Sequence, residues 1–332
     1  MATLNIYGCG GAGINLAKKY IANSAASQHE EGFCDMKAYF IDTSRSNLND
    51  PAFNQENVYL MDGLDGSGKK RDSNYGAIRE RSKEIVQKFK PSEINVVIHS
   101  ASGGSGSVIG PILAGEISEK SLTVIILIGS TDSRIETDNT IKTIMGYEVI
   151  AQKKDMPVAV MYYENGADKT RGMIDNEIGV DIALLSILFS GDNAELDSAD
   201  LKNFINYQNV TTYKPSLTRL EFFSKEIELA RDQYVASLAT LTDENTDSKS
   251  NILVSYQAVG YINRASSAAL NNGAGNAKLP IHAAMIVGYF HPHISSLQAK
   301  LAEFDEHRAT VVQKSIADKA MVEKATDDGL IF

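Results

Sequence analysis

Two glycine-rich loops contain the residues whose types and spacing could do chemistry. The first, Gly8 to Gly13 (GCGGAG), lies between an apolar run and a segment with helical spacing. Because glycine has no side chain, backbone N–H groups and a helix N-terminus can approach a phosphate closely there. Gly8, Gly10 and Gly13 match G-x-G-x-x-G, and Asp42 ends the next apolar run, where a ribose-binding acid could lie. This loop alone therefore leaves an NAD-dependent Rossmann oxidoreductase open.

The second loop, Ser102 to Ser107 (SGGSGS), also follows an apolar run and precedes a helical segment. It predicts a second anion-binding loop, whereas a dinucleotide fold normally needs one. Two such loops indicate a polyphosphate held from two sides. The stretch GLDGSGKKRDS resembles a P-loop, but its glycines and lysines are out of register, so no P-loop lysine is expected.

The elements that must position these loops alternate between strands and helices. Apolar, β-branched runs predict strands at 3–7, 36–42, 94–100, 122–130 and 158–163. Spacings of three and four predict helices at 75–89, 107–120 and around 140–150. Strands that are apolar throughout are typical of a parallel sheet covered on both faces. We expect residues 1–171 to form a doubly wound α/β nucleotide-binding domain.

The pattern changes after residue 171. Residues 172–190 are apolar nearly all round, which predicts a buried central helix between two domains. Residues 191–310 are expected to form a smaller α+β domain, with strands at 252–262 and 282–290, helices at 216–239 and 295–305, and a polar loop at 242–251. Residues 311–332 are expected to form a last helix, at 313–324, and an acidic tail.

Composition narrows the function classes. The 332 residues are 43% hydrophobic and 22% charged, with a formal net charge of −10, which favours a globular chain with a sizeable core. Lysine and arginine are scattered, so we expect no direct binding of nucleic acid, and the longest apolar runs are too short for a membrane span. Cys9 and Cys34 cannot form a metal cage alone, and a reducing cytosol fits best.

The pair of glycine loops resembles the tubulin and FtsZ superfamily of GTP-dependent filament proteins. The first loop matches G-x-G-G-x-G-x-N from Gly8 to Asn15, and residues 102–108 approximate the signature [SAG]-G-G-[TS]-G-[ST]-G, with Val108 in place of the last glycine. The run S-G-S-V-x-G-P at 105–111 is similar to the smaller phage-encoded branch called PhuZ. The resemblance implies a tubulin-like fold, GTP or GDP with Mg²⁺ as cofactors, and GTP hydrolysis coupled to polymerisation.

The same resemblance implies a phosphate site made of both loops. In the first loop, the nucleotide is expected to contact Gly10, Gly11, Ala12 and Asn15 through its α and β phosphates and its base side. In the second loop, the phosphate chain is expected to be wrapped by Ser102, Gly103, Gly104, Ser105, Gly106 and Ser107. Asp42 and Thr43 are expected near magnesium and the terminal phosphate. Residues 66–76 occupy the place of the loop that senses the γ-phosphate, although their lysines and arginine depart from the family's residues.

The resemblance also implies contacts to the nucleoside. The family's ribose loop corresponds to Asp132, Glu136 and Asn139, and the guanine edge is expected to be read by Asn165 with Asp175 or Asn176. Carboxylates and amides can pair with the N1–H and amine of guanine. A solvent-exposed helix cap remains the alternative for each of these acids.

An acidic loop follows the central helix. ELDSADLKNF, at 195–204, resembles the family's N-x-D-x-x-D, with Asp197 and Asp200 as the acids and Glu195 replacing the asparagine. A helix of about 30 Å separates these acids from the guanine contacts. The resemblance implies that Glu195, Asp197 and Asp200 complete the active site of the next subunit in a head-to-tail filament. The alternative is a helix N-cap at Asp197 or Ser198.

The implied partner is therefore the protein itself, as a homopolymer in the cytoplasm of a phage-infected bacterium, where it would position phage DNA or capsids indirectly. The acidic end, residues 326–332, could be a second assembly element or a frayed terminus. The oxidoreductase alternative leaves the second glycine loop and the acidic loop without a role. A third hypothesis, a nucleotide-binding assembly protein that does not hydrolyse, rests on Val108 and Glu195 as departures from the family pattern.

Overall fold

The computed structural model describes residues 2–27, 32–166, 169–223, 234–243, 252–262 and 279–322; for 20–27 and 311–322 it describes the backbone alone. The strands are β1 (Thr3–Cys9), β2 (Asp35–Asp42), β3 (Val58–Leu60), β4 (Ile94–Ser100), β5 (Leu122–Ser130), β6 (Val158–Asn165), β7 (Leu217–Phe223), β8 (Tyr234–Thr242), β9 (Tyr256–Tyr261) and β10 (Ile281–Val287). The helices are α1 (Gly10–Ser27), α2 (Tyr75–Lys88), α3 (Gly106–Ser118), α4 (Arg134–Lys154), α5 (Arg171–Leu188), α6 (Ser198–Ile205) and α8 (Phe290–Val322).

All ten strands belong to one sheet, in the order β3-β2-β1-β4-β5-β6-β7-β10-β8-β9. Among them, β10 alone runs antiparallel to its neighbours, β7 and β8. The first six strands have the order 3-2-1-4-5-6 of a doubly wound fold, which confirms the predicted α/β class. Because β7 pairs with β6, the strands of the expected smaller domain continue the same sheet.

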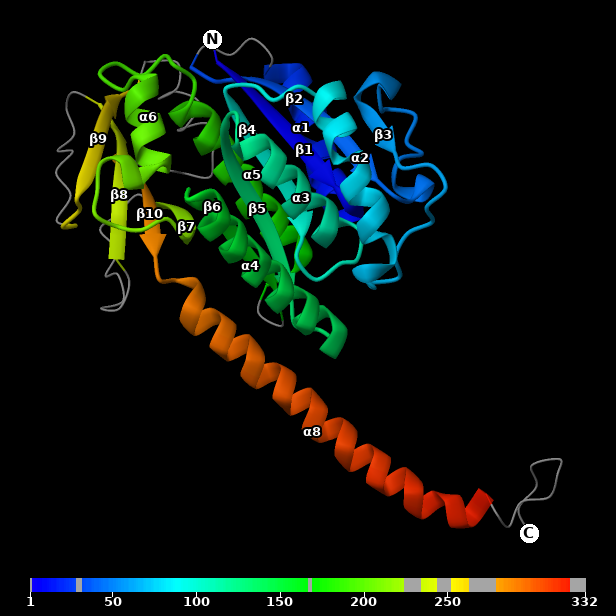
Figure 1. Cartoon of the computed structure of the whole chain (residues 1–332). Coiled ribbons are helices and arrows are strands. Elements are labelled where there is room, and N and C mark those ends of the chain that lie inside the picture. Colours follow the sequence, from blue (N-terminus) through cyan, green and yellow to red (C-terminus); the bar gives the residue numbers. More distant parts are fainter. Residues whose placement is uncertain are drawn as a thin grey trace.

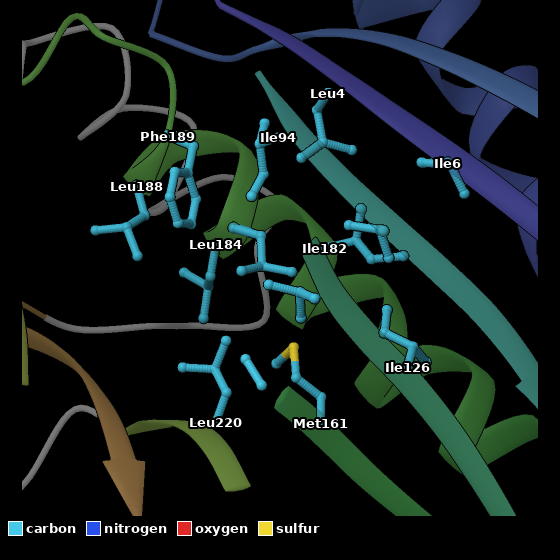
Figure 2. Close-up of a cluster of buried hydrophobic side chains, with 14 of the residues drawn as sticks. Leu4, Ile6, Ile94, Ile126, Met161, Ile182, Leu184, Leu188, Phe189 and Leu220 are labelled. Atoms are coloured by element: carbon cyan, nitrogen blue, oxygen red, sulfur yellow. The ribbon is translucent and has the colours of Figure 1, made fainter. Parts of the chain in front are cut away.

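Helices cover both faces of the sheet (Figure 1). On one face, the strands pack against α1, α5 and α6, and on the other against α2, α3, α4 and the start of α8. Figure 2 shows part of the first cluster, where Leu4, Ile126 and Met161 of the sheet lie close to Ile182 and Leu184 of α5. Each such side chain contributes roughly 1.5–3 kcal/mol on full burial, so this core fixes α5 against the sheet.

The prediction of a helix at 216–239 is wrong. Residues 217–223 form β7 and residues 234–242 form β8, while 224–233 lie outside the described residues. Leucine, glutamate, lysine and alanine give this segment a high helix propensity, but burial between neighbouring strands outweighs propensity. In β8, eight of the nine residues are buried, and small side chains such as Ala236 and Ala239 fit the space between two covering layers.

The last described element of the chain is a long helix, α8. The first turns of α8 bury Phe290 and Leu297 against the body, and Arg134 of α4 pairs with Asp305 at 2.5 Å. Farther along, α8 extends away from the body (Figure 1), and it merges the helices expected at 295–305 and 313–324. The acidic tail at 326–332 and most of the loop at 242–251 lie outside the described residues. None of the helices in the described part of the chain is long and apolar enough to cross a bilayer.

Candidate nucleotide-binding site and acidic loop

The two glycine loops meet at the carboxyl edge of the sheet. They follow β1 and β4, which are neighbours, and the strand order reverses between these two strands. Open α/β sheets bind ligands at such a switch point. Gly10 has φ +69°, and a Cβ there would lie 2.8 Å from Cα of Gly106, so the two loops can approach only as glycines.

A cavity of about 380 Å³ opens between these loops. Ten of the nucleotide-site residues expected from the sequence line it: Gly10, Gly11, Ala12, Asp42, Ser102, Gly103, Gly104, Ser105, Gly106 and Glu136. The first residues of α1 and α3, Gly10 and Gly106, line it, and the first N–H groups of a helix have no partner within the helix. The cavity can therefore hold a phosphate chain between two helix N-termini.

Asp42 is the buried acid of this cavity, with 1% of its surface exposed. Its Oδ2 accepts a hydrogen bond from Nδ2 of Asn47 at 2.6 Å, and its Oδ1 accepts one from the backbone N–H of Thr43 at 2.6 Å. Burial raises the pKa of the Asp42 carboxyl despite these hydrogen bonds, which lower it. A bound cation would favour the ionised form, so the Asp42 carboxyl has the chemistry of a ligand for a divalent cation.

Glu136 is the second acid of the cavity. Its carboxylate accepts hydrogen bonds from Nζ of Lys69 at 2.8 Å and from Oγ of Ser133, the N-cap of α4, at 2.7 Å. Burial alone would raise the pKa of the Glu136 carboxyl, but the bonds from Lys69 and Ser133 outweigh it and hold the pKa below its usual value. Glu136 is thus ionised beside a cavity suited to anions.

Three predicted residues lie behind the cavity and support its wall. The amide Nδ2 of Asn139 donates to the backbone oxygens of Lys69 at 2.9 Å and Ser102 at 3.1 Å. Oγ of Ser107 donates to the backbone oxygen of Gly103 at 2.6 Å, and the hydroxyl of Thr43 lies 2.7 Å from that of Ser105. These contacts position the second loop.

The residues expected to contact the base lie on β6 and α5. Oδ1 of Asn165, at the carboxyl end of β6, is buried and has no hydrogen-bond partner among the described residues. Such an orphan acceptor suits a ligand that donates hydrogen bonds. Asp175 pairs with Lys19 of α1 instead, and Asn176 is exposed. Asn15 and Asp132 are also exposed, and neither lines the cavity.

Several lining residues escaped the sequence analysis as individual site residues: Cys9, Ser44, Asn47, Ser67 and Ser100. The motif flanking Cys9 could have indicated it, since Cys9 lies inside the first loop. No pattern marks Asn47, whose role depends on a turn that brings it back onto Asp42.

The acidic loop begins α6 at the opposite edge of the sheet. Asp197 is the N-cap of α6, and its Oδ1 accepts from the N–H groups of Ala199 at 2.7 Å and Asp200 at 2.9 Å. In return, Oδ2 of Asp200 accepts from the N–H of Asp197 at 3.3 Å, which completes a capping box. The backbone N–H groups of Asp200 and Ala199 lower the pKa of the Asp197 carboxyl, so it is ionised at neutral pH.

A second contact fixes Asp200. The hydroxyl of Tyr256, on β9, donates to Oδ1 of Asp200 at 2.9 Å. Burial and this bond to a carboxylate raise the pKa of Tyr256 to about 12, so it remains a donor at neutral pH. Glu195 has φ +62°, a left-handed conformation that asparagine adopts more readily. This conformation gives a physical reason for asparagine in the family pattern.

The acidic loop and the glycine loops lie far apart. Helix α5, with 18 residues, spans roughly 27 Å and joins the carboxyl edge of the sheet to its amino edge. At the amino edge, Ser190 accepts a hydrogen bond from the N–H of Ala2 at 3.2 Å. Figure 1 shows α6 on the same side as the N-terminus. A hollow of about 1150 Å³ lies there, between the acidic loop and the starts of β1, β4 and β5, and its lining includes Ala2, Ile94 and Leu122.

Comparison with known proteins adds the family. Residues 4–161, from β1 into β6, match the GTPase domain of the Tubulin/FtsZ family. Residues 4–161 are a Tubulin/FtsZ GTPase domain. The match covers both glycine loops, so it confirms the resemblance inferred from them and favours the GTPase interpretation over the oxidoreductase alternative.

Phage proteins are among the relatives of this chain. It is 26% identical over 205 residues to the phage tubulin-like protein of Pseudomonas phage 201phi2-1, an alignment that spans 61% of either protein's length. It is also 26% identical over 239 residues, 71% of either length, to the phage tubulin-like protein of Pseudomonas phage PhiPA3.

Solved structures confirm the Tubulin/FtsZ fold over the whole chain. The GDP-bound phage tubulin PhuZ superposes with a TM-score of 0.78 at 21% identity, and 99% of each chain is covered. A subunit from the protofilament of TubZ from bacteriophage PhiKZ gives a TM-score of 0.75 at 23% identity, with the same coverage.

Proposed function

We propose that the protein is a GTPase that polymerises head to tail, and that hydrolysis is completed where the acidic loop of one subunit meets the nucleotide of the next. One observation carries the proposal. The phosphate cavity lies at the carboxyl edge of the sheet and the acidic loop at the amino edge, roughly one length of α5 apart. No single subunit can bring both to one phosphate.

Repeated head-to-tail contact would bring the two edges together. Such a contact does not close on itself and generates an open polymer. The polymer structures known for PhiKZ TubZ and for PhuZ201 support this geometry for a chain of the same fold. Because assembly completes the site and hydrolysis alters the contact, nucleotide state and polymer stability become linked.

The acids would act on the attacking water. Phosphoryl transfer depends on positioning and on stabilising charge, and a carboxylate can orient a water or accept its proton. In the capping box, Asp197 is held ionised, which suits orientation of water better than proton abstraction. Asp200 has both oxygens fixed by Asp197 and Tyr256, which suits a group that must meet a water at a defined angle. Glu195 is exposed beside them.

GTP or GDP is the proposed ligand. The GDP-bound structure of PhuZ supports a guanine nucleotide as the ligand. The unpaired Oδ1 of Asn165 provides an acceptor for a base that carries N–H donors. Asp42 and Thr43 would lie on the side of Mg²⁺, which would neutralise phosphate charge when bound. We also propose that the polymer works in the cytoplasm of a phage-infected bacterium and positions phage DNA or particles without binding nucleic acid itself.

Light scattering and phosphate release, followed together after addition of GTP and Mg²⁺, test the proposal. We expect scattering to rise above a critical protein concentration and GTP hydrolysis to appear only above it. Hydrolysis that is proportional to protein at every concentration would contradict a shared site. Assembly without phosphate release would identify the non-hydrolysing alternative instead.

A further inference from the structure

The lining of the phosphate cavity has too little positive charge for a bound triphosphate. Among the described residues that line it, none is lysine or arginine, and two are acids, Asp42 and Glu136. A nucleoside triphosphate would add about four further negative charges within a few ångströms of these carboxylates. Helix N-termini supply only about half a charge each, so helix dipoles and one Mg²⁺ leave an excess of negative charge.

One lysine side chain, that of Lys69, is paired with an acid of the cavity lining. Nζ of Lys69 lies 2.8 Å from Oε1 of Glu136, a lining residue, and half of the Lys69 side chain is exposed. The backbone of Lys69 is just as close, because a Cβ at Gly104 would meet Cα of Lys69 at 3.1 Å. A lysine side chain is longer than these separations, so its ammonium can move from Glu136 to a phosphate without movement of the backbone.

The backbone of Lys69 is held in an uncommon conformation. Its φ is +66°, and the flanking Gly66 and Gly68 are left-handed as well. A non-glycine residue in this region is strained and is retained where its surroundings fix it. Here Nδ2 of Asn139 binds the Lys69 carbonyl, and Arg71 fastens the same loop to the backbone oxygens of Asn139 at 3.0 Å and Ser107 at 3.2 Å.

We propose that Lys69 is a phosphate ligand supplied by the subunit itself, and that its ammonium exchanges Glu136 for the phosphate chain when nucleotide binds. The inference rests on the proposed function and deepens it. Since the triphosphate carries more charge than the diphosphate, the exchange favours GTP over GDP. The glycine loops cannot supply this preference alone, because their N–H groups carry only partial charges.

Equilibrium binding of fluorescently labelled GTP and GDP to the full chain, with Mg²⁺ and below the assembly concentration, tests the role of Lys69. We expect Lys69→Gln to weaken GTP binding roughly tenfold or more and GDP binding by less, in keeping with the strength of charge-assisted hydrogen bonds. Lys153→Gln removes the same charge from an exposed position near the end of α4, outside the cavity lining, and should leave both affinities unchanged. Lys69→Arg should restore most of the preference for GTP.

The possible results distinguish failure of the role of Lys69 from failure of the proposed GTPase function. Equal losses for GTP and GDP, or affinities equal to those of the parent protein, would overturn the role of Lys69 while nucleotide binding stands. If the parent protein bound neither nucleotide, the proposed function would fall and the inference with it. Added KCl should reduce the difference between Lys69→Gln and the parent, because half of the Lys69 side chain is exposed to solvent and salt screens its charge.

Discussion

At the carboxyl edge of the sheet, glycines and serines make up most of the cavity lining, whereas at the amino edge the acidic loop presents the carboxylates of Glu195, Asp197 and Asp200. The first edge depends on the absence of side chains, since Gly10 and Gly106 lie in contact. The second depends on charges held by hydrogen bonds, as in the capping box of Asp197 and Asp200. The two edges should therefore fail differently: added atoms should damage the first, and loss of charge should damage the second.

Removal of one charge at the amino edge should have the largest effect. Asp200→Asn keeps the shape: its amide oxygen can still accept from the N–H of Asp197, and its amide nitrogen can donate to the Tyr256 hydroxyl, but it cannot act as a carboxylate. We expect GTP hydrolysis to fall by about 100-fold or more, the usual contribution of an acid–base group, with GTP affinity and filament formation retained. Phosphate release and sedimentation of the same samples measure both.

The matched control is Asp62→Asn, an exposed acid with 83% of its side chain accessible. It should leave hydrolysis unchanged. Parental hydrolysis by Asp200→Asn would remove Asp200 from the catalytic assignment. Loss of filaments as well as hydrolysis would assign the residue to assembly and not to chemistry.

A single methyl group at the carboxyl edge should have the next largest effect. In Gly106→Ala, the new Cβ would meet the backbone oxygen of Cys9 at 2.8 Å, a contact that only backbone movement can relieve. We expect the two loops to separate and GTP affinity to fall roughly tenfold or more, since donors that no longer converge lose charge-assisted hydrogen bonds. Titration with labelled GTP measures this loss.

Gly146→Ala, within α4, is the control, because a Cβ there meets nothing within 4 Å. It should bind GTP as the parent does. A mixture of Gly106→Ala and Asp200→Asn then tests the shared site, since about a quarter of random head-to-tail contacts would pair two intact edges. Hydrolysis by the mixture should exceed that of either variant alone, and no gain would argue against a site made by two subunits.

Loss of one hydrogen bond at the amino edge should have a smaller effect. Tyr256→Phe removes the hydroxyl that donates to Oδ1 of Asp200 at 2.9 Å and lies 3.4 Å from the backbone oxygen of the same residue. We expect kcat to fall about fivefold, the equivalent of about 1 kcal/mol, while GTP affinity stays constant. A change in GTP affinity without a change in kcat would contradict a role in positioning Asp200.

Local pattern was sufficient for much of this molecule. The glycine loops were predictable because each lies between an apolar strand and a helix, with α1 beginning at Gly10 and α3 at Gly106. The apolar runs, buried on both faces, marked the parallel strands. Contacts between distant segments were not predictable. Tyr256 reaches Asp200 across 56 residues, and Asn47 acts through a turn that no motif records. The strands near 216–239 were hidden because sheet pairing outweighed a helical composition.

Asp181, midway along α5, should affect stability and leave both edges intact. Burial raises the pKa of this carboxyl to about 6, aided by Glu177 and Glu221 and opposed by hydrogen bonding from Tyr163 and by Arg219. Because the folded pKa exceeds the unfolded value, stability is full below about pH 4 and falls as the pH rises through 6. A shift of about two pKa units corresponds to about 3 kcal/mol at most.

Asp181→Asn cannot ionise, so it should gain stability over the parent above pH 6 and lose this advantage near pH 4. We expect a gain of roughly 1–2 kcal/mol at pH 7.5, because a neutral amide forms a weaker bond with Tyr163 than a carboxylate does. Urea unfolding at both pH values measures the difference, and an equal gain at pH 4 and 7.5 would exclude titration as its cause. Since α5 joins the two edges through its packing and not through this charge, hydrolysis should stay at the parental rate.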